Sequence, residues 1–168
     1  NGLRARLEQL QSLIDAHQPD IIGLQEIKVH DEVFPVADIE AMGYTPFYHG
    51  QKAHYGVALL CKLQPDAIQR GFPDDEPDAQ RRMIIGTFTQ SNGRKLTLLN
   101  GYFPQGENRD HETKFPAKQK FYADLQTYLD ASKRRYIHLL DGGLSDNLGL
   151  RAMLDRLELT GNAGELAN

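Results

Sequence analysis

The stretch DIIGLQE at residues 20–26 decides the fold. Its short apolar run, bounded by polar residues, is typical of a buried β-strand. Before it, leucines and an isoleucine recur at helical spacing across residues 3–17, which predicts an amphipathic helix. Gln25 and Glu26 then stand at the carboxyl end of the strand, where open α/β sheets tend to bind ligands. The stretch therefore predicts an α/β protein with a carboxylate at a sheet edge.

The rest of the chain extends this α/β pattern. Further strands are predicted at residues 56–62, 82–89, 95–102 and 136–140. The turn SNGR at residues 91–94 favours a hairpin between two of them. A second helix is expected around Pro116, because proline is tolerated in the first turn of a helix. Helices mixed with hairpins and buried strands indicate an α/β fold with packed sheets.

The composition is that of one globular domain, with 168 residues, 40% of them hydrophobic and 25% charged. No stretch approaches ~18 uninterrupted apolar residues, so no transmembrane helix is expected, and the first residues do not resemble a signal peptide. The single cysteine, Cys61, excludes an internal disulfide and fits a reducing compartment, so we expect a cytoplasmic protein. Because Cys61 lies in an apolar run, a buried, inert thiol is favoured.

The net charge of −4 argues against a non-specific nucleic-acid coat protein. Residues 51–135 are the only net-basic part, with fourteen Lys and Arg against ten Asp and Glu. A solvated surface is the ordinary interpretation of so small an excess, and contact with phosphates is the alternative.

Two residues at predicted strand ends could carry chemistry. Glu26 offers a hard oxygen ligand of the kind Mg²⁺ prefers, although a solvated glutamate at a strand end would look the same. Tyr102 lies in NGYFPQG at residues 100–106, where glycines and a proline turn the chain sharply. Its hydroxyl could bind a phosphoryl oxygen or exchange a proton, and a core aromatic beside a loop is the alternative.

Polar and aromatic residues in YHGQKAHYG at residues 48–56 predict a loop that contacts phosphates and stacks on bases. The two histidines there have no cysteine or third histidine nearby, so zinc is not favoured. Arg81, Arg82 and the segment at residues 109–114 are weaker candidates for phosphate contacts. The sequence contains neither a GxxxxGK[ST] phosphate loop nor a GxSxG elbow, which disfavours nucleotide-hydrolysing enzymes and serine hydrolases.

Read in order, these segments resemble the exonuclease III family. The matching strings are NGLRAR (1–6), DIIGLQEIKV (20–29), FYHGQK (47–52), HYGVA (54–58), QRR (80–82), NGYFPQG (100–106) and KFPAK (114–118). The likeness covers about residues 1–137. It implies a four-layer α/β sandwich of the DNase I-like type, with two mixed sheets flanked by helices.

The resemblance also implies a function. Relatives cut DNA beside abasic sites and digest duplexes from 3′ ends with Mg²⁺, and Mn²⁺ is a possible substitute. Glu26 falls on the metal-binding glutamate and Tyr102 on the active-site tyrosine of the family. His49, Lys52, Arg81 and Arg82 fall in segments near the DNA. The expected partner is double-stranded DNA with abasic sites or 3′ ends, bound by a monomer without membrane contact.

The end of the chain departs from the family. Where relatives carry Gly-Asp-X-Asn after the strand at residues 136–140, this chain reads DGGLSDN at 141–147, and the closing Ser-Asp-His is absent. The first strand of the family would precede Asn1. Either the protein is a remnant without catalysis or family segments are missing around residues 137–150; we favour the second. We therefore expect residues 1–168 to form one incomplete domain of the endonuclease/exonuclease/phosphatase type.

On that interpretation, LDRLELT at residues 154–160 resembles a later strand of the family. Asp155 then matches a carboxylate that supports the catalytic machinery, although an ordinary surface acid fits as well. Three functions follow: a Mg²⁺-dependent exodeoxyribonuclease III or abasic-site endonuclease, another phosphodiesterase of the superfamily, or a non-catalytic DNA-binding relative. The DNA-type segment at residues 47–56 favours the first over the second.

Overall fold

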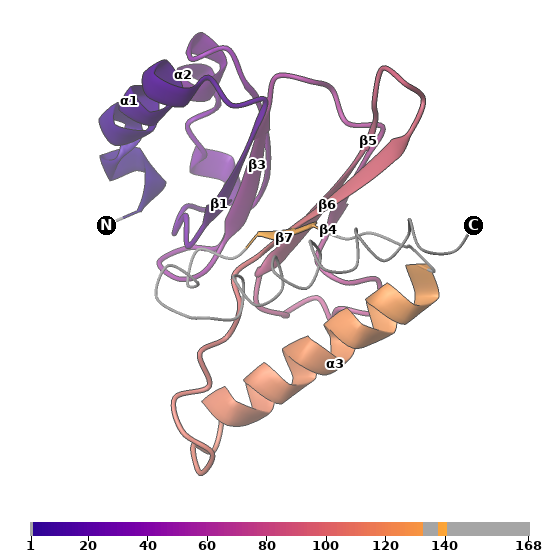
Figure 1. Ribbon diagram of the computed structural model, residues 1–168. Coiled ribbons are helices and arrows are strands. Elements are labelled where there is room, and N and C mark those ends of the chain that lie inside the picture. The colour runs from indigo at the N-terminus through magenta and orange to yellow at the C-terminus, as the bar shows by residue number, and fades with distance from the viewer. Residues whose placement is uncertain (1, 133–137, 141–168) are drawn as a thin grey trace, which may run out of the picture.

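The computed structural model describes residues 2–132 and the backbone of residues 138–140. Figure 1 shows the helices and strands of this part of the chain. In chain order they are the 3₁₀ turn η1 (Leu3–Ala5), α1 (Leu7–His17), β1 (Ile21–Gln25), the 3₁₀ turn η2 (Asp31–Val33), α2 (Val36–Ala41), β2 (Thr45–His49), β3 (Val57–Cys61), β4 (Ala67–Arg70), β5 (Met83–Thr89), β6 (Lys95–Gly101), α3 (Lys114–Ser132) and β7 (His138–Leu140).

The strands form two sheets. The first has the order β1-β3-β2 with antiparallel pairs, and the second has the order β4-β5-β6-β7. In the second sheet only the β6–β7 pair is parallel, while β5 and β6 form the hairpin predicted from the turn at residues 91–94. The predicted α/β class with packed sheets is confirmed.

The central strand β3 explains why residues 56–62 read as a continuous apolar run. All of its residues are buried, because both faces of the strand are covered. Val57, Leu59 and Cys61 pack between the sheets against Ile84 and Phe88 of β5. The alternate side chains of β3 point to the other face of the first sheet, as the period of two in a strand requires.

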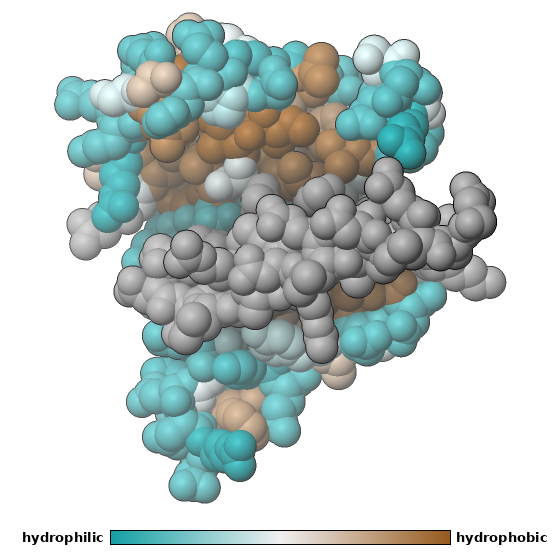
Figure 2. Space-filling view, in the orientation of Figure 1, coloured by the Kyte–Doolittle hydropathy of each residue, from teal (hydrophilic) through white to brown (hydrophobic). Residues whose placement is uncertain are grey.

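The helices cover the outer faces of the two sheets, as Figure 1 shows. Leu10 and Ile14 of α1 join a core cluster with Leu60 of β3. Phe121 and Leu125 of α3 pack on the second sheet. In Figure 2 the hydrophobic residues gather in the middle of the molecule, between hydrophilic surfaces. No helix in residues 2–132 is long and apolar enough to span a bilayer.

Two predictions about local structure were wrong. The helix expected over residues 3–17 is interrupted at Arg6, whose φ of −128° is not helical. The chain breaks there because the Leu3 N–H bonds to the carbonyl of Ile27, 2.9 Å away, which draws residues 3–5 toward the end of β1. The loop expected over residues 48–56 begins later, because residues 45–49 form the edge strand β2 beside β3.

The buried thiol predicted for Cys61 is confirmed, since its exposed fraction is 0%. Burial raises the pKa of Cys61 to about 12, so the reactive thiolate is scarce at neutral pH. We expect the native protein to leave 5,5′-dithiobis(2-nitrobenzoate) unreduced over minutes, while the urea-unfolded chain reacts with one equivalent. Rapid release of thionitrobenzoate from the folded protein would contradict this assignment.

Thr97 of β6 is buried, and its hydroxyl has no hydrogen-bond partner within the part of the chain that the structure describes. An unpaired buried hydroxyl loses its bonds to water on folding without replacement. We expect Thr97→Val to leave the free energy of unfolding unchanged or to raise it by up to about 1 kcal/mol. Urea denaturation followed by circular dichroism measures this, and a clear loss of stability would reveal a bond made by the hydroxyl.

Candidate functional site

Asn100 near the end of β6 ties the two sheets together. Its side chain is fully buried, and its amide nitrogen donates to the carbonyls of Leu24 in β1 and Ala58 in β3, at 3.0 and 2.8 Å. Its amide oxygen accepts a hydrogen bond from the side chain of Gln25. Glu26 follows Gln25, and Tyr102 lies two residues after Asn100. The hydrogen bonds of Asn100 therefore bring both predicted site residues to the same edge of the packed sheets.

The chain leaves β1 in a conformation that turns Glu26 outward. Glu26 and Lys28 have φ values of +53°, in the left-handed region that non-glycine residues seldom adopt. The turn is fixed because the Ile27 and Lys28 N–H groups donate to the carbonyls of Gly56 and Tyr55, at 3.1 and 3.0 Å. Such strained residues cluster at functional sites when the surrounding structure determines their conformation.

Gly56 is required at this contact. Its φ is +81°, and a Cβ there would lie 2.7 Å from a side-chain carbon of Ile27. Its N–H donates to the carbonyl of Arg81 at 2.9 Å. The glycine therefore joins the strand end at Glu26 to the segment that precedes β5.

Glu26 and Tyr102 lie close enough to shift each other's pKa. The pKa of Glu26 is lowered mainly by its hydrogen bond with Lys28, and a hydrogen bond from Tyr102 adds to this. The Lys28 ammonium lies 3.0 Å from the Glu26 carboxylate, whose side chain is 45% exposed. Burial and the Glu26 charge raise the pKa of Tyr102. Near neutral pH the site therefore presents a carboxylate beside a protonated phenol that can donate.

The four residues predicted to contact DNA have different surroundings. Lys52 is exposed and makes no hydrogen bond or ion pair with residues 2–132. Arg81 is engaged by Asp31, at 2.7 Å, and by the Gly50 carbonyl, at 2.5 Å. Arg82 bonds to Gln80 and to the Tyr102 backbone. His49 ends β2 and is partly buried. Asp155 lies outside the described residues, as does the rest of the segment from 141 to 168.

The pKa of His49 is lowered, first by burial and then by the charge of Arg81. The folded state therefore favours the neutral imidazole, and the unfolded state binds a proton at higher pH. Stability should fall as pH drops below the unfolded pKa of about 6.5, and the loss should stop below the folded pKa. We expect His49→Gln to reduce this acid-induced loss in urea titrations between pH 7.5 and 5. An identical pH dependence in both proteins would contradict the assignment.

The side chains fit a divalent cation held by one protein carboxylate. Among residues 2–132 there is no group of three or more His, Cys, Asp or Glu residues placed to hold a metal. Mg²⁺ commonly binds through one or two carboxylates, with water and substrate phosphate completing its shell. The exposed Glu26 carboxylate matches that mode.

Sequence reasoning missed the residues that organise the site. Asn100 was noted within a turn motif, but not as the bridge between the sheets. A polar residue directly after the apolar run of β6 is the signal that could have found it, because a buried amide needs partners. Lys28 and Tyr55, which hold the turn after Glu26 in place, carried no separate signal.

Comparisons with known proteins agree with this arrangement. Residues 1–140 match the model of the Endonuclease/Exonuclease/phosphatase family, and the chain belongs to that family. Within it, the chain is 62% identical over 130 residues to exodeoxyribonuclease III from Haemophilus influenzae, covering 77% of this chain and 48% of that protein. It is 27% identical to a DNA-(apurinic or apyrimidinic site) endonuclease from Dictyostelium discoideum, covering 70% of this chain and 31% of that protein. The resemblance to the exonuclease III family is thereby confirmed.

Solved structures share the fold. A 3′ phosphatase from Neisseria bound to a product DNA hairpin has a TM-score of 0.74 and 32% identity, covering 84% of this chain and 53% of that one. An AP endonuclease from Archaeoglobus fulgidus has a TM-score of 0.72 and 29% identity, covering 84% and 53%. The chain thus spans about half the length of these two structures and of the Haemophilus enzyme, and less of the Dictyostelium protein.

Proposed function

We propose that this chain is part of a Mg²⁺-dependent DNA-repair nuclease, an exodeoxyribonuclease III or abasic-site endonuclease that hydrolyses phosphodiester bonds. The observation that carries the proposal is that Glu26 and Tyr102, at adjoining strand ends of a fold of this family, lie close enough to shift each other's pKa. The strong identity to an exodeoxyribonuclease III supports the choice among activities of the family.

Each residue of the pair has a role. Glu26 would hold the metal, with Mn²⁺ as a possible substitute for Mg²⁺. When bound, the ion polarises the scissile phosphate and neutralises charge on the leaving oxygen. Tyr102, protonated near neutral pH, donates a hydrogen bond to a phosphoryl oxygen. Without a metal ion, the Lys28 ammonium pairs with the Glu26 carboxylate. When the carboxylate holds the metal, Lys28 can turn to a DNA phosphate.

The substrate that we propose is double-stranded DNA with abasic sites or 3′ ends. Lys52, which is exposed and has no partner among residues 2–132, is the best placed of the predicted contacts to meet a backbone phosphate. His49 and Arg81 complete the proposed DNA-facing set, whereas Arg82, which was predicted with them, bonds to the Tyr102 backbone. An abasic site lacks a stacked base, so extruding it from the duplex requires less energy than extruding a paired nucleotide.

The proposed architecture of the whole protein is a four-layer α/β sandwich that acts as a monomer. It is supported by three core clusters, one between the sheets and one under the helices on each outer face. Residues 1–168 would form one domain of the family type, with the family segments around residues 137–150 missing and Asp155 supplying a supporting carboxylate.

The test is incubation of the full-length protein that contains this chain with a duplex that carries one abasic site, with Mg²⁺ and with excess EDTA. Incision beside the abasic site in Mg²⁺ alone is the expected result. Binding in a gel-shift experiment without any EDTA-sensitive cleavage would favour the second candidate, a non-catalytic DNA-binding relative. The specific observation behind that candidate is that residues 141–147 read DGGLSDN where relatives carry Gly-Asp-X-Asn. Cleavage of a small phosphodiester but not of DNA would indicate another phosphodiesterase of the superfamily.

A further inference from the structure

Arg82 forms two hydrogen bonds with the backbone of Tyr102, one through its own carbonyl and one through its side chain. The Tyr102 N–H donates to the carbonyl of Arg82 at 2.7 Å, and one terminal nitrogen of the Arg82 guanidinium donates to the carbonyl of Tyr102 at 2.9 Å. The backbone of Tyr102 is thereby held on both sides of its Cα atom. Both contacts form directly after β6 ends, where the chain turns away from the sheet.

The side chain of Arg82 also stacks on the two tyrosines at the site. Its guanidinium carbon lies 4.0 Å from the ring centroid of Tyr55 and 4.9 Å from that of Tyr102. A guanidinium over an aromatic face is attracted by the ring at these distances. The centroids of the two tilted rings lie 6.3 Å apart, so the Arg82 guanidinium contacts both rings at once.

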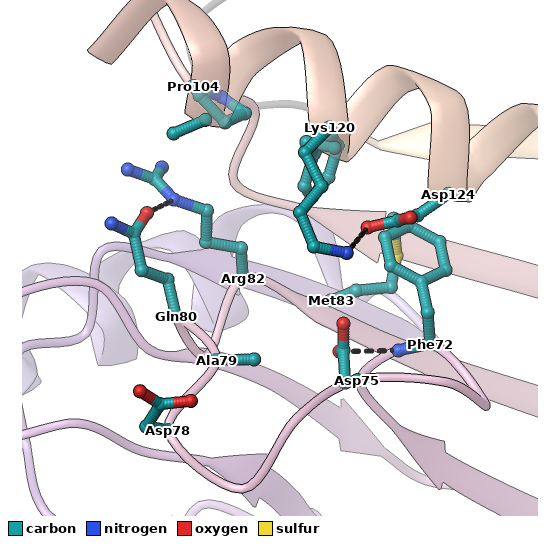
Figure 3. Close-up of a pocket in the computed structure, with 12 residues that line it drawn as sticks. Phe72, Asp75, Asp78, Ala79, Gln80, Arg82, Met83, Pro104, Lys120 and Asp124 are labelled. Carbon is teal, nitrogen blue, oxygen red and sulfur yellow. Dashed lines mark hydrogen bonds and ion pairs between the residues drawn. The ribbon is translucent and has the colours of Figure 1, made fainter. Parts of the chain in front are cut away.

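A third contact fixes the orientation of the guanidinium. Its Nε–H donates to the side-chain oxygen of Gln80 at 2.7 Å, as Figure 3 shows. The Arg82 side chain is partly buried, and burial lowers its pKa, although a guanidinium stays charged in proteins. The planar guanidinium of Arg82 is thus held by the Tyr102 carbonyl, the Gln80 side-chain oxygen and the faces of the Tyr55 and Tyr102 rings.

We propose that Arg82 is a positioning residue that sets the Tyr102 ring at the site, and that it acts through Tyr102 rather than through a DNA phosphate. The inference rests on the proposed function, in which Tyr102 contacts the substrate. Arg82 and Tyr102 both line a cavity of about 360 Å³ that Gln105 and Lys114 also reach. A ring free to rotate there would spend less time in the orientation that donates to a phosphoryl oxygen.

The neighbouring arginine provides a matched control. Arg81 has the same charge and a similar degree of burial, but its guanidinium contacts Asp31 and Gly50. Removing that side chain should loosen the segment around residue 50 without touching Tyr102. Lys52 gives the opposite comparison, because it is the residue proposed to make a simple phosphate contact.

The first experiment needs neither DNA nor metal. Carbon-13 NMR of ring-labelled tyrosine, assigned with Tyr102→Phe, compares the chain with Arg82→Met, Arg82→Lys and Arg81→Met. We expect Arg82→Met to shift or broaden the Tyr102 and Tyr55 signals and Arg82→Lys to restore them in part. Arg81→Met should leave both in place. Gln80→Ala, at an exposed position, should shift them less and provides a readout if Arg82→Met does not fold.

The second experiment measures binding of abasic duplex in EDTA over a range of salt concentrations. Loss of one phosphate contact lowers the slope of log affinity against log salt by about 0.9. We expect that loss for Lys52→Ala and an unchanged slope for Arg82→Met. In the cleavage assay, Arg82→Met should lower kcat by about 10- to 100-fold with little change in KM, because misplaced groups slow the chemical step.

Unmoved tyrosine signals in Arg82→Met, or a salt slope reduced as in Lys52→Ala, would overturn the positioning role. Failure of the proposed function looks different, because the unsubstituted full-length protein would then cleave no DNA while the tyrosine signals still reported on Arg82.

Discussion

Replacing Glu26 with glutamine is expected to lower Mg²⁺-dependent cleavage of an abasic duplex by at least about 100-fold. The amide keeps the size of the side chain but removes the charge that a hard cation requires. Because Lys28 loses its ion-pair partner in this variant, duplex affinity in EDTA should stay the same or rise. The combination of lost cleavage and retained binding separates a metal ligand from a residue needed for folding.

Glu32→Gln is the matched control for this experiment. Glu32 is an exposed acid close to Glu26 in the sequence. Its carboxylate lies 3.6 Å from the Nδ1 atom of His30. Cleavage by this variant should stay within about twofold of the unsubstituted chain, since exposed ion pairs contribute little. Equal losses in both variants would show that general negative charge matters and would remove Glu26 from the proposed metal site.

Replacing Asn100 with alanine is expected to lower the free energy of unfolding by about 2–5 kcal/mol. The change leaves the carbonyls of Leu24 and Ala58 without the donor they now share and leaves the Gln25 amide without its acceptor. It also opens a cavity at a fully buried position between the sheets. Urea denaturation followed by circular dichroism gives the difference in stability.

The Thr97→Val variant is the control for Asn100→Ala, since it removes a buried hydroxyl that has no partner within the described part of the chain. Asn100→Asp provides a second comparison, because it keeps the acceptor for Gln25 but loses both donors to the carbonyls. We expect the aspartate variant to be destabilised at neutral pH as well. If Asn100→Ala lowered the free energy of unfolding by less than about 0.5 kcal/mol, the hydrogen bonds of Asn100 would not be what holds the strand ends together.

The sequence predicted the elements whose signals are local. The apolar run at residues 56–62 became the buried strand β3, and the turn at residues 91–94 became the β5–β6 hairpin. The strand end before Glu26 was also predicted correctly. These signals depend on residue type and spacing, which a single sequence shows directly. The resemblance to a family then linked Glu26 and Tyr102, which are far apart in the chain.

The parts that depend on tertiary contacts were not predicted. The edge strand β2 has mixed burial and no apolar alternation strong enough to mark it. The break at Arg6 arises from a bond between Leu3 and the distant Ile27. The left-handed conformation of Glu26 is imposed by pairing with residues 55–56. Each of these features is decided by a partner remote in sequence, so local propensity has little to say about it.

The arginines illustrate the same limit. Arg81 and Arg82 are adjacent and both were expected to face DNA, yet their guanidinium groups bind different parts of the protein. Consecutive residues in an extended segment point to opposite sides, so neighbours in sequence need not share a role. Which arginine meets Tyr102 depends on how the segment enters β5.

The central claim is that Glu26 holds a divalent cation beside Tyr102, and Mn²⁺ tests it most directly. Paramagnetic Mn²⁺ added to the ring-labelled chain should broaden the Tyr102 signal before those of Tyr44 and Tyr128, which belong to core clusters away from this edge. The effect should disappear in Glu26→Gln. Broadening that is equal for all three tyrosines, or that persists without the Glu26 carboxylate, would contradict the account.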